Sequence, residues 1–243
     1  MPPVMQPVVI QYEHRKIQEE VLEEFEFGTI TRNRLGCEVL NVEQVMFIDW
    51  DVDVRAHLRT KSTPFLARIH QVFFGLKPAQ LEAAAREAKQ IRYQQIRDQL
   101  KNLGIPSGML SARVYETHGG FRGIVTSSLF TPGEEVSQAL LTELGSDALY
   151  TKLCRIQGTF RARLTPKYWR LGIGQRPFEA GHRAAFTPAI GAQWLERYDR
   201  DSADRAVCRF VAQFGPEASD PIVRAVIALH DRRCKAHQML ELA

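Results

Sequence analysis

Three aspartates alternate along one strand-like segment of the chain. Val45–Val54 begins with apolar residues and then carries Asp49, Asp51 and Asp53 at every second position. Side chains at alternate positions of a β-strand point to the same face, so the three carboxylates are expected to form a column. Oxygen ligands of this kind suit Mg²⁺ or Mn²⁺, and two such ions can stabilise phosphoryl transfer. The alternative is a strand end whose aspartates are neutralised by neighbouring arginines.

Basic residues follow the aspartates in two places. Arg122 comes just after the turn THGG (Thr117–Gly120), on a strand expected beside the aspartates, and the string FRARLTPKYWR carries Arg161, Arg163 and Lys167. Guanidinium groups bind phosphate oxygens through paired hydrogen bonds. These four residues are therefore candidates for binding a nucleotide or nucleic acid. An internal network of ion pairs with the aspartates is an equally good interpretation.

The charge is unevenly distributed around a net value of +4. Glutamates are concentrated between Glu13 and Glu26, whereas the segment from Lys152 to Arg183 contains eight basic residues and only one acidic residue, Glu179. Such asymmetry favours an anionic partner, and nucleic acid or a nucleoside triphosphate is the first candidate. Three aromatic residues that could stack on bases lie among these cations: Phe160, Tyr168 and Trp169.

The composition is that of an ordinary globular protein. The chain has 243 residues, of which 44% are hydrophobic and 25% are charged. It has no apolar run long enough for a membrane span and no secretory signal, so we expect a cytoplasmic protein without a membrane partner. The cysteines are scattered without a C-x-x-C motif, which predicts reduced, buried thiols rather than a zinc knuckle. They are Cys37, Cys154, Cys208 and Cys234.

Two features near the C-terminus are weak as metal motifs. His230 and Asp231 resemble a metal-binding His-Asp pair, but a single pair on a basic helix is expected at the surface. Cys234 and His237 have a spacing that suits zinc, yet no second pair of ligands accompanies them. The sequence also lacks a P-loop, a G-x-G-x-x-G motif and a G-x-S-x-G motif.

The elements that must position the aspartates follow the order strand, helix, strand, strand, helix, strand. Pro78–Leu103 predicts a long helix, because proline suits the first turn and Gly104 suits the stop. Two β-prone runs around THGG predict a hairpin. Glu134–Gly145 is predicted as a helix, and Thr159–Thr165 as a strand. This order is that of a split βαβ, or ferredoxin-like, core, with the last strand at the edge beside the aspartate strand.

The fold class predicted from this order is α+β, with a ferredoxin-like or RRM-like palm (βαββαβ). Residues 45–170 form the palm, 1–44 an N-terminal extension, and 171–243 a helical C-terminal block packed on the core. Within the extension, Val8–Tyr12 predicts a strand and Val21–Phe27 a helix. Helix starts are expected at Ser202 and at Asp220, which precedes a proline.

One motif resembles that of a known family. The string VMFIDWD (Val45–Asp51) resembles the first catalytic motif of archaeo-eukaryotic-type primases, in which several apolar residues precede Asp-x-Asp. The resemblance extends over about half the chain and implies an RRM-like palm in which Asp49 and Asp51 hold the metal ions for nucleotidyl transfer. The second motif of that family carries a histidine at the place of Arg122, while His118 lies in the turn.

The sequence thus predicts a metal-dependent nucleotidyl or phosphoryl transfer enzyme that acts on nucleotides or nucleic acid. Two other functions stay open. The first is a non-catalytic module that binds single-stranded RNA or DNA on the open face of the sheet. The second is a subunit of a larger assembly, which would dock on protein partners through the acidic N-terminal segment and the basic C-terminal half.

Overall fold

The protein has an α+β fold built around two antiparallel sheets. The computed structural model describes residues 8–12, 15–61, 78–103, 110–174 and 191–243. The first sheet contains, in spatial order, β1 (Val8–Tyr12), β2 (Arg15–Phe25), β3 (Gly28–Arg32), β4 (Glu38–Val42) and β8 (Phe160–Arg163). The second contains β10 (Cys208–Phe214), β6 (Ala112–Thr117), β7 (Gly120–Val125) and β5 (Phe47–Asp51). A short parallel pair joins β9 (Arg205–Ala206) and β11 (Glu241–Leu242).

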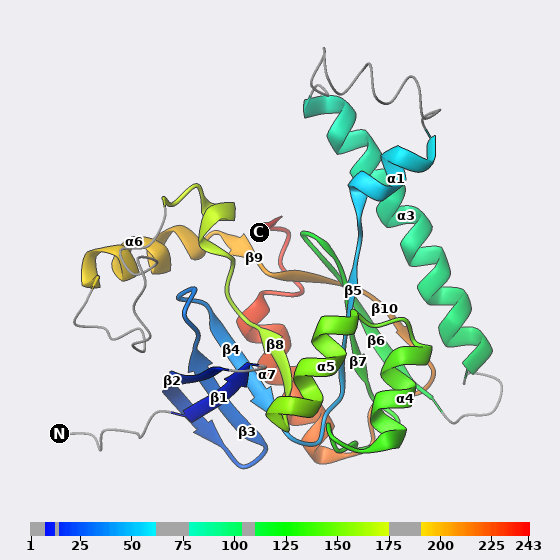
Figure 1. Ribbon diagram of the computed structural model, residues 1–243, viewed down its shortest axis with the longest axis horizontal. Helices are drawn as coiled ribbons and strands as arrows, with labels where there is room; N and C mark the ends of the chain where they lie inside the picture. Colours follow the sequence, from blue (N-terminus) through cyan, green and yellow to red (C-terminus); the bar gives the residue numbers. More distant parts are fainter. Residues whose placement is uncertain (1–7, 13–14, 62–77, 104–109, 175–190) are drawn as a thin grey trace.

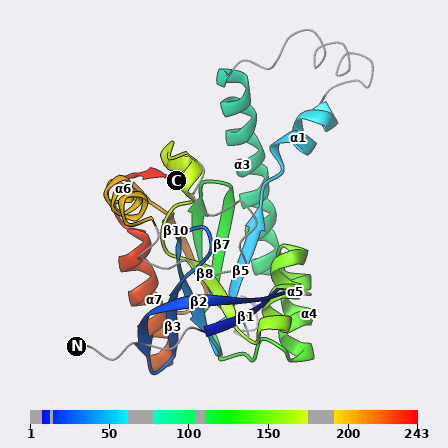
Figure 2. The ribbon, with the colours of Figure 1, turned by 60° about the vertical axis from the view of Figure 1, so that its left-hand side comes forward.

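The helices lie around these sheets, and one pair extends away from them. They are α1 (Val54–Lys61), α3 (Pro78–Leu103), α4 (Glu135–Glu143), α5 (Ala148–Gln157), the 3-10 helix η1 (Tyr168–Leu171), α6 (Ala192–Ser202) and α7 (Pro221–Cys234). Helices α1 and α3 pack on each other and project beyond the sheets in both views (Figures 1 and 2). None of the described helices combines the length and apolar character that crossing a membrane requires.

Three of the predicted strands pair in the expected order. Strand β7 pairs with β5 on one side and β6 on the other, which is the order expected of a split βαβ unit. Helix α3 has the predicted bounds, and the THGG turn joins β6 to β7. The fourth strand is the exception, because β8 pairs with β4 in the other sheet and not with β5. Strand β8 shares four register pairs with β4, and this pairing between segments distant in sequence is not encoded in the local pattern of β8.

Two segments predicted to be helical contain strands. The helix at Val21–Phe27 is wrong, because these residues belong largely to β2, which pairs with β1 and β3. The wholly helical C-terminal block is also wrong, since β10 extends the second sheet beside β6. Ser202 ends helix α6 and does not begin one, whereas Asp220 caps α7 through Ile222 N and Val223 N. Strand pairing with distant segments overrides local helical spacing at these places.

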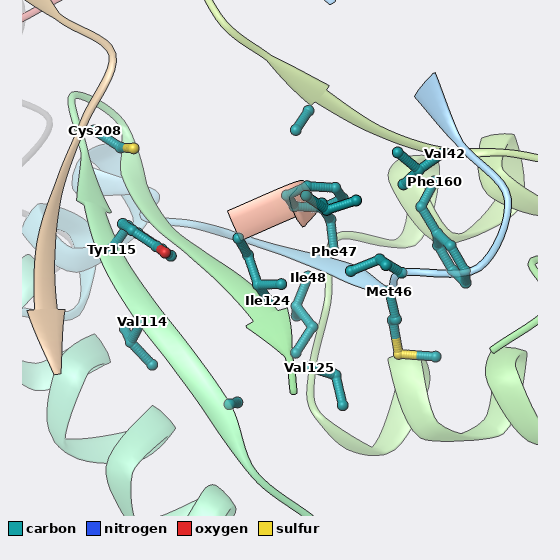
Figure 3. Packing of buried hydrophobic residues seen from close by; sticks show 14 of the residues in the cluster. Val42, Met46, Phe47, Ile48, Val114, Tyr115, Ile124, Val125, Phe160 and Cys208 are labelled. Carbon is teal, nitrogen blue, oxygen red and sulfur yellow. The ribbon is translucent and has the colours of Figure 1, made fainter. Parts of the chain in front are cut away.

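One hydrophobic core joins the two sheets. It contains residues of β4, β5, β6, β7 and β8 together with the inner face of α7. In Figure 3, Phe47 and Ile124 lie near the centre of this cluster, and Tyr115 and Cys208 lie at one end. Trp50 faces α4, where its indole N–H donates to the Leu144 carbonyl over 2.6 Å. Because both sheets contribute residues to one core, the packing of that core sets the distance between them.

The pairing of β5 with β7 leaves no room for a side chain at Gly120. A Cβ atom built there would lie 2.0 Å from the Trp50 carbonyl oxygen. We expect Gly120→Ala to lower the free energy of unfolding by about 1–3 kcal/mol, the usual cost of overpacking. The matched control is Gly133→Ala, because a Cβ at that position meets nothing within 4 Å. Urea unfolding of both variants measures the difference; equal stabilities would contradict the close approach.

Candidate functional site

A cavity of about 180 Å³ opens between the two sheets and helix α5. Four of the seven residues predicted from the sequence line it: Asp49, Arg122, Arg161 and Arg163. Asp49 is the middle residue of β5, Arg122 comes from β7, and the other two arginines come from β8. The alternation predicted for β8 is confirmed, since Phe160 and Ala162 are buried in the core while the two arginines face the cavity.

Asp49 is the most enclosed carboxylate of the aspartate strand. Its backbone is held by Asp147 N, which donates to the Asp49 carbonyl over 2.7 Å. Among the described residues its carboxylate forms no hydrogen bond or ion pair, even though Arg122 is its register partner on β7. Burial raises the pKa of Asp49; Arg122 counteracts this shift, and the carboxylate of Asp51 adds to it. Asp49 is therefore a carboxylate without a bonded partner at the wall of a cavity.

The other two aspartates are placed differently. Asp51 is the last residue of β5 and is exposed. Asp53 lies beyond the strand, and its carboxylate accepts a hydrogen bond from Ala56 N over 2.9 Å. The predicted column of three carboxylates is thus wrong at Asp53, because the chain has turned toward α1 and the side chain serves that helix start, a usual role for aspartate. Asp49 and Asp51 remain close enough for their charges to interact.

Arg122 is buried, with 6% of its surface exposed. Its Nη1 donates to the Arg163 carbonyl oxygen over 2.9 Å and lies 3.1 Å from His230 Nε2 on α7. The same nitrogen is 3.7 Å from Cys234 Sγ. Arg122 therefore connects β7 to the first sheet and to α7, and it forms no ion pair with Asp49.

The two arginines of β8 differ in their partners. Arg161 donates to Glu19 Oε2 over 2.6 Å, and this buried glutamate also accepts from Thr31. The side chain of Arg163 forms no hydrogen bond or ion pair with any residue of the described chain. Burial lowers the pKa of the Arg163 guanidinium, and the charge of Arg122 lowers it further. Only one of the two arginines is thus neutralised by a carboxylate.

Two further cations, Lys167 and Arg170, interact electrostatically with Arg163. Burial and the charges of Arg163 and Arg170 lower the pKa of Lys167, whose Nζ lies 5.3 Å from the centre of the Trp169 ring. Arg170 sits over the THGG turn, because a Cβ built at Gly119 would lie 3.4 Å from its Nη2. Lys167, Arg170 and the exposed ring of Trp169 together form what we call the basic rim.

Sequence reasoning missed a second polar cluster. The side chains of Cys208, His230 and Cys234 are fully buried. In the part of the chain that the structure describes, they form a group of three potential metal ligands whose donor atoms lie within 4.8 Å of one another. The prediction that His230 lies at the surface is wrong, because α7 packs this face on the core. The spacing of His230 and Cys234, four residues apart on one helix, was the available signal. Cys208 could not be added to it without knowing that β10 joins the sheet.

No protein-family model, curated protein or solved structure matches this chain. Glu13, Arg176, Glu179 and Arg183, which contribute to the predicted charge asymmetry, lie outside the described residues. The geometry of the cavity and of the basic rim is therefore the basis on which a function can be proposed.

The raised pKa of Asp49 makes a prediction about stability and pH. A folded-state pKa above the unfolded value means that the folded chain holds this proton more tightly. Protonated Asp49 therefore stabilises the folded chain relative to ionised Asp49. This stabilisation is fully present below the ordinary carboxyl pKa, about 3.9, and is lost as the pH rises through the folded-state pKa. At neutral pH we expect Asp49→Asn to be more stable than the wild type, with a difference that shrinks in acid.

The matched control is Asp53→Asn, which makes the same chemical change two residues away. Asparagine caps a helix about as well as aspartate, so this variant should follow the wild type at each pH. Urea unfolding at neutral and acid pH compares the three proteins. An Asp49→Asn variant less stable than the wild type at neutral pH would show that the carboxylate is not penalised by its burial.

Proposed function

We propose that the protein binds the phosphates of a nucleotide or nucleic acid between its two sheets and catalyses a metal-dependent nucleotidyl or phosphoryl transfer. One observation carries the proposal. Asp49 and Arg163 line the same cavity, and neither side chain has a bonded partner among the described residues. A buried carboxylate without a partner is stabilised by a cation, and a buried guanidinium without a partner is stabilised by an anion. A complex of a divalent cation with a phosphate supplies both.

The donor atoms fit a hard cation. Asp49 and Asp51 offer carboxylate oxygens, the ligands that Mg²⁺ and Mn²⁺ prefer. When bound, the metal ion would neutralise charge that develops on the transferring phosphoryl group. Asp53 is assigned to the start of α1 and has no part in this proposal. Asp49 and Asp51 are the proposed catalytic residues.

The cations of the site have a separate task. Arg163 and Arg122 would hold phosphate oxygens within the cavity, and Lys167 would attract the phosphate chain at the rim. Arg161 is already paired with Glu19, so we assign it to the wall of the cavity. Positioning and electrostatic stabilisation are the main contributions of a protein to this type of chemistry.

The strand order gives further support. Strand β5 is antiparallel to β7, which separates it from β6, as in the first three strands of a palm. Asp49 is the middle residue of β5 and Asp51 is the last, and the resemblance to primases implies metal ligands at these two positions. The extra pairing of β8 with β4 closes the cavity on its second side. The ferredoxin-like palm is therefore part of the proposal, with β8 transferred to the neighbouring sheet.

Removal of the proposed metal ligands should abolish turnover. We expect Asp49→Ala and Asp51→Ala each to lower the Mn²⁺-dependent turnover of nucleoside triphosphates, or primer synthesis from them, by roughly 100-fold or more. Activity of the purified protein, measured with and without Mn²⁺, tests this. Asp53→Asn is the matched control and should keep the wild-type rate. Turnover that survives Asp49→Ala in a folded protein would remove the catalytic role.

Phosphate binding is tested separately from turnover. We expect Arg163→Gln to weaken the binding of a nucleoside triphosphate roughly 10- to 100-fold, the loss that accompanies a charged hydrogen bond. Arg155→Gln makes the same change at an exposed position of α5, away from the cavity lining, and should leave the affinity unchanged. Equilibrium titration by calorimetry measures both. Equal affinities for the two variants would contradict phosphate binding at Arg163.

A second candidate function is the binding of single-stranded nucleic acid without catalysis. The observation that favours it is the basic rim, where Trp169 is 50% exposed beside Lys167 and could stack on a base. Base–aromatic stacking is worth about 1–3 kcal/mol per base. We expect Trp169→Ala to weaken the binding of a single-stranded oligonucleotide roughly 5- to 150-fold, while Trp169→Phe retains most of the affinity.

Fluorescence anisotropy at several salt concentrations measures these affinities. A loss in Trp169→Ala with unchanged salt dependence would indicate stacking, because phosphate contacts alone set that dependence. Tight oligonucleotide binding together with no turnover in any metal would favour this second function over transfer.

A further inference from the structure

Two cysteines and a histidine meet in the core directly behind Arg122. Cys208 begins β10, while His230 and Cys234 lie one helical turn apart on α7. All three side chains are 0% exposed. Their donor atoms, two Sγ and one Nε2 or Nδ1, all lie within 4.8 Å of one another. Polar side chains from β10 and α7, two elements that are far apart in sequence, thus meet within an apolar part of the core.

The spacing of these atoms suits three of the four positions around a tetrahedral zinc ion, which leaves the fourth to a water molecule. Cys208 Sγ lies 3.8 Å from His230 Nε2. A metal ion about 2.3 Å from sulfur and about 2.0 Å from nitrogen would hold two such ligands roughly 3.5 Å apart at the tetrahedral angle. Cys234 approaches from the same helix face as His230, as residues four apart do. Small side-chain adjustments would bring all three donors to one ion.

The histidine is held in the orientation that a metal ligand needs. His230 Nδ1 lies 3.0 Å from Asp231 Oδ1, so the carboxylate accepts the Nδ1 proton and leaves the lone pair of Nε2 directed at the cysteines. Asp231 is fixed in turn by Arg113 Nη2, at 3.1 Å, and by His237 Nε2, at 2.9 Å. A carboxylate behind a histidine is the usual outer shell of a protein zinc site.

Arg122 approaches the same point from the cavity side. Its Nη1 lies 3.1 Å from His230 Nε2 and would compete with a metal ion for that lone pair. The guanidinium has a second hydrogen bond, to the Arg163 carbonyl, that does not involve the cluster. Its register partner across the strand is Asp49. Arg122 can therefore give up His230 without losing every polar contact.

We propose that Cys208, His230 and Cys234 form a binding site for a zinc ion, with Arg122 displaced from Nε2 when the ion binds. The two thiol protons leave to solvent on binding, and the sulfurs and Nε2 each donate an electron pair to the metal. Two thiolates neutralise the charge of Zn²⁺, so the complex brings no net charge into the core. Thiolate ligands disfavour Mg²⁺ and Ca²⁺.

This site is separate from the carboxylates of the proposed function. The Mg²⁺ or Mn²⁺ proposed there would bind oxygen donors at the cavity, whereas zinc would bind sulfur and nitrogen behind Arg122. Arg122 is shared by the two proposals, but metal binding at the cysteines can be measured without any nucleotide, so the failure of one proposal is distinguishable from the failure of the other.

The test is a titration of reduced, metal-free protein with Co²⁺ in the absence of oxygen. Cobalt in this site should give an intense thiolate-to-metal charge-transfer absorption and the visible bands of a tetrahedral ion, saturating at one Co²⁺ per chain. Zn²⁺ should remove the absorption and Mg²⁺ should not. We expect Cys208→Ser to bind Co²⁺ at least about 10-fold more weakly. The matched control is Cys37→Ser, a buried cysteine outside the cluster, which should bind as the wild type does.

Folding of each variant is checked by circular dichroism. A folded wild-type protein that develops no charge-transfer absorption overturns the proposal and leaves Arg122 as the permanent partner of His230. Equal absorption in a folded Cys208→Ser variant overturns it as well. Where Cys208→Ser fails to fold, alkylation of the wild type decides. At a urea concentration that exposes the thiols, Zn²⁺ should protect Cys208 and Cys234 but not Cys37 or Cys154; equal protection of all four would refute the site.

Discussion

A single buried guanidinium connects the parts of this molecule. Arg122 sits in the central strand β7, where its charge cannot remain without polar partners because the core around it is apolar. It finds them in three different elements: the Arg163 carbonyl at the end of β8, His230 on α7, and the field of Asp49 on β5. The first sheet, the second sheet and the C-terminal helix are thus positioned around one side chain. Their relative placement defines the cavity.

The same framework keeps opposite charges apart. Asp49 and Arg163 influence each other's pKa, yet they belong to strands of different sheets and form no ion pair. Strand β8 shares four register pairs with β4, and the Arg163 carbonyl accepts a hydrogen bond from Arg122, so the backbone of Arg163 is held away from β5. The two sheets therefore place a carboxylate and a guanidinium at the same cavity without an ion pair between them.

Local sequence signals predicted the local parts of this arrangement. Pro78 and Gly104 bracket a helix whose bounds are as expected, and the THGG turn and the alternation in β8 specify a hairpin and a two-faced strand. These signals depend on neighbours in the chain. The partner of β8, the strand character of β2 and the entry of β10 beside β6 depend on pairing between distant segments, which periodicity does not encode. The expectation that Arg163 lies near Asp49 assumed that β8 pairs beside β5, whereas β8 pairs with β4. The contacts of Glu19 with Arg161 and of Cys208 with His230 had no local signal in the sequence.

The cations and the carboxylate of the site carry opposite electrostatic penalties. The pKa values of Lys167 and Arg170 are lowered by burial and by other cations, Arg163 among them. An anion at the rim relieves that repulsion, so the unliganded rim is less stable than the liganded one. Asp49, which lines the cavity, is penalised in the opposite sense and would be relieved by a cation. A ligand that brings only one sign of charge would relieve only one of these penalties. Under the proposed function, a phosphate bound together with its metal ion would relieve both.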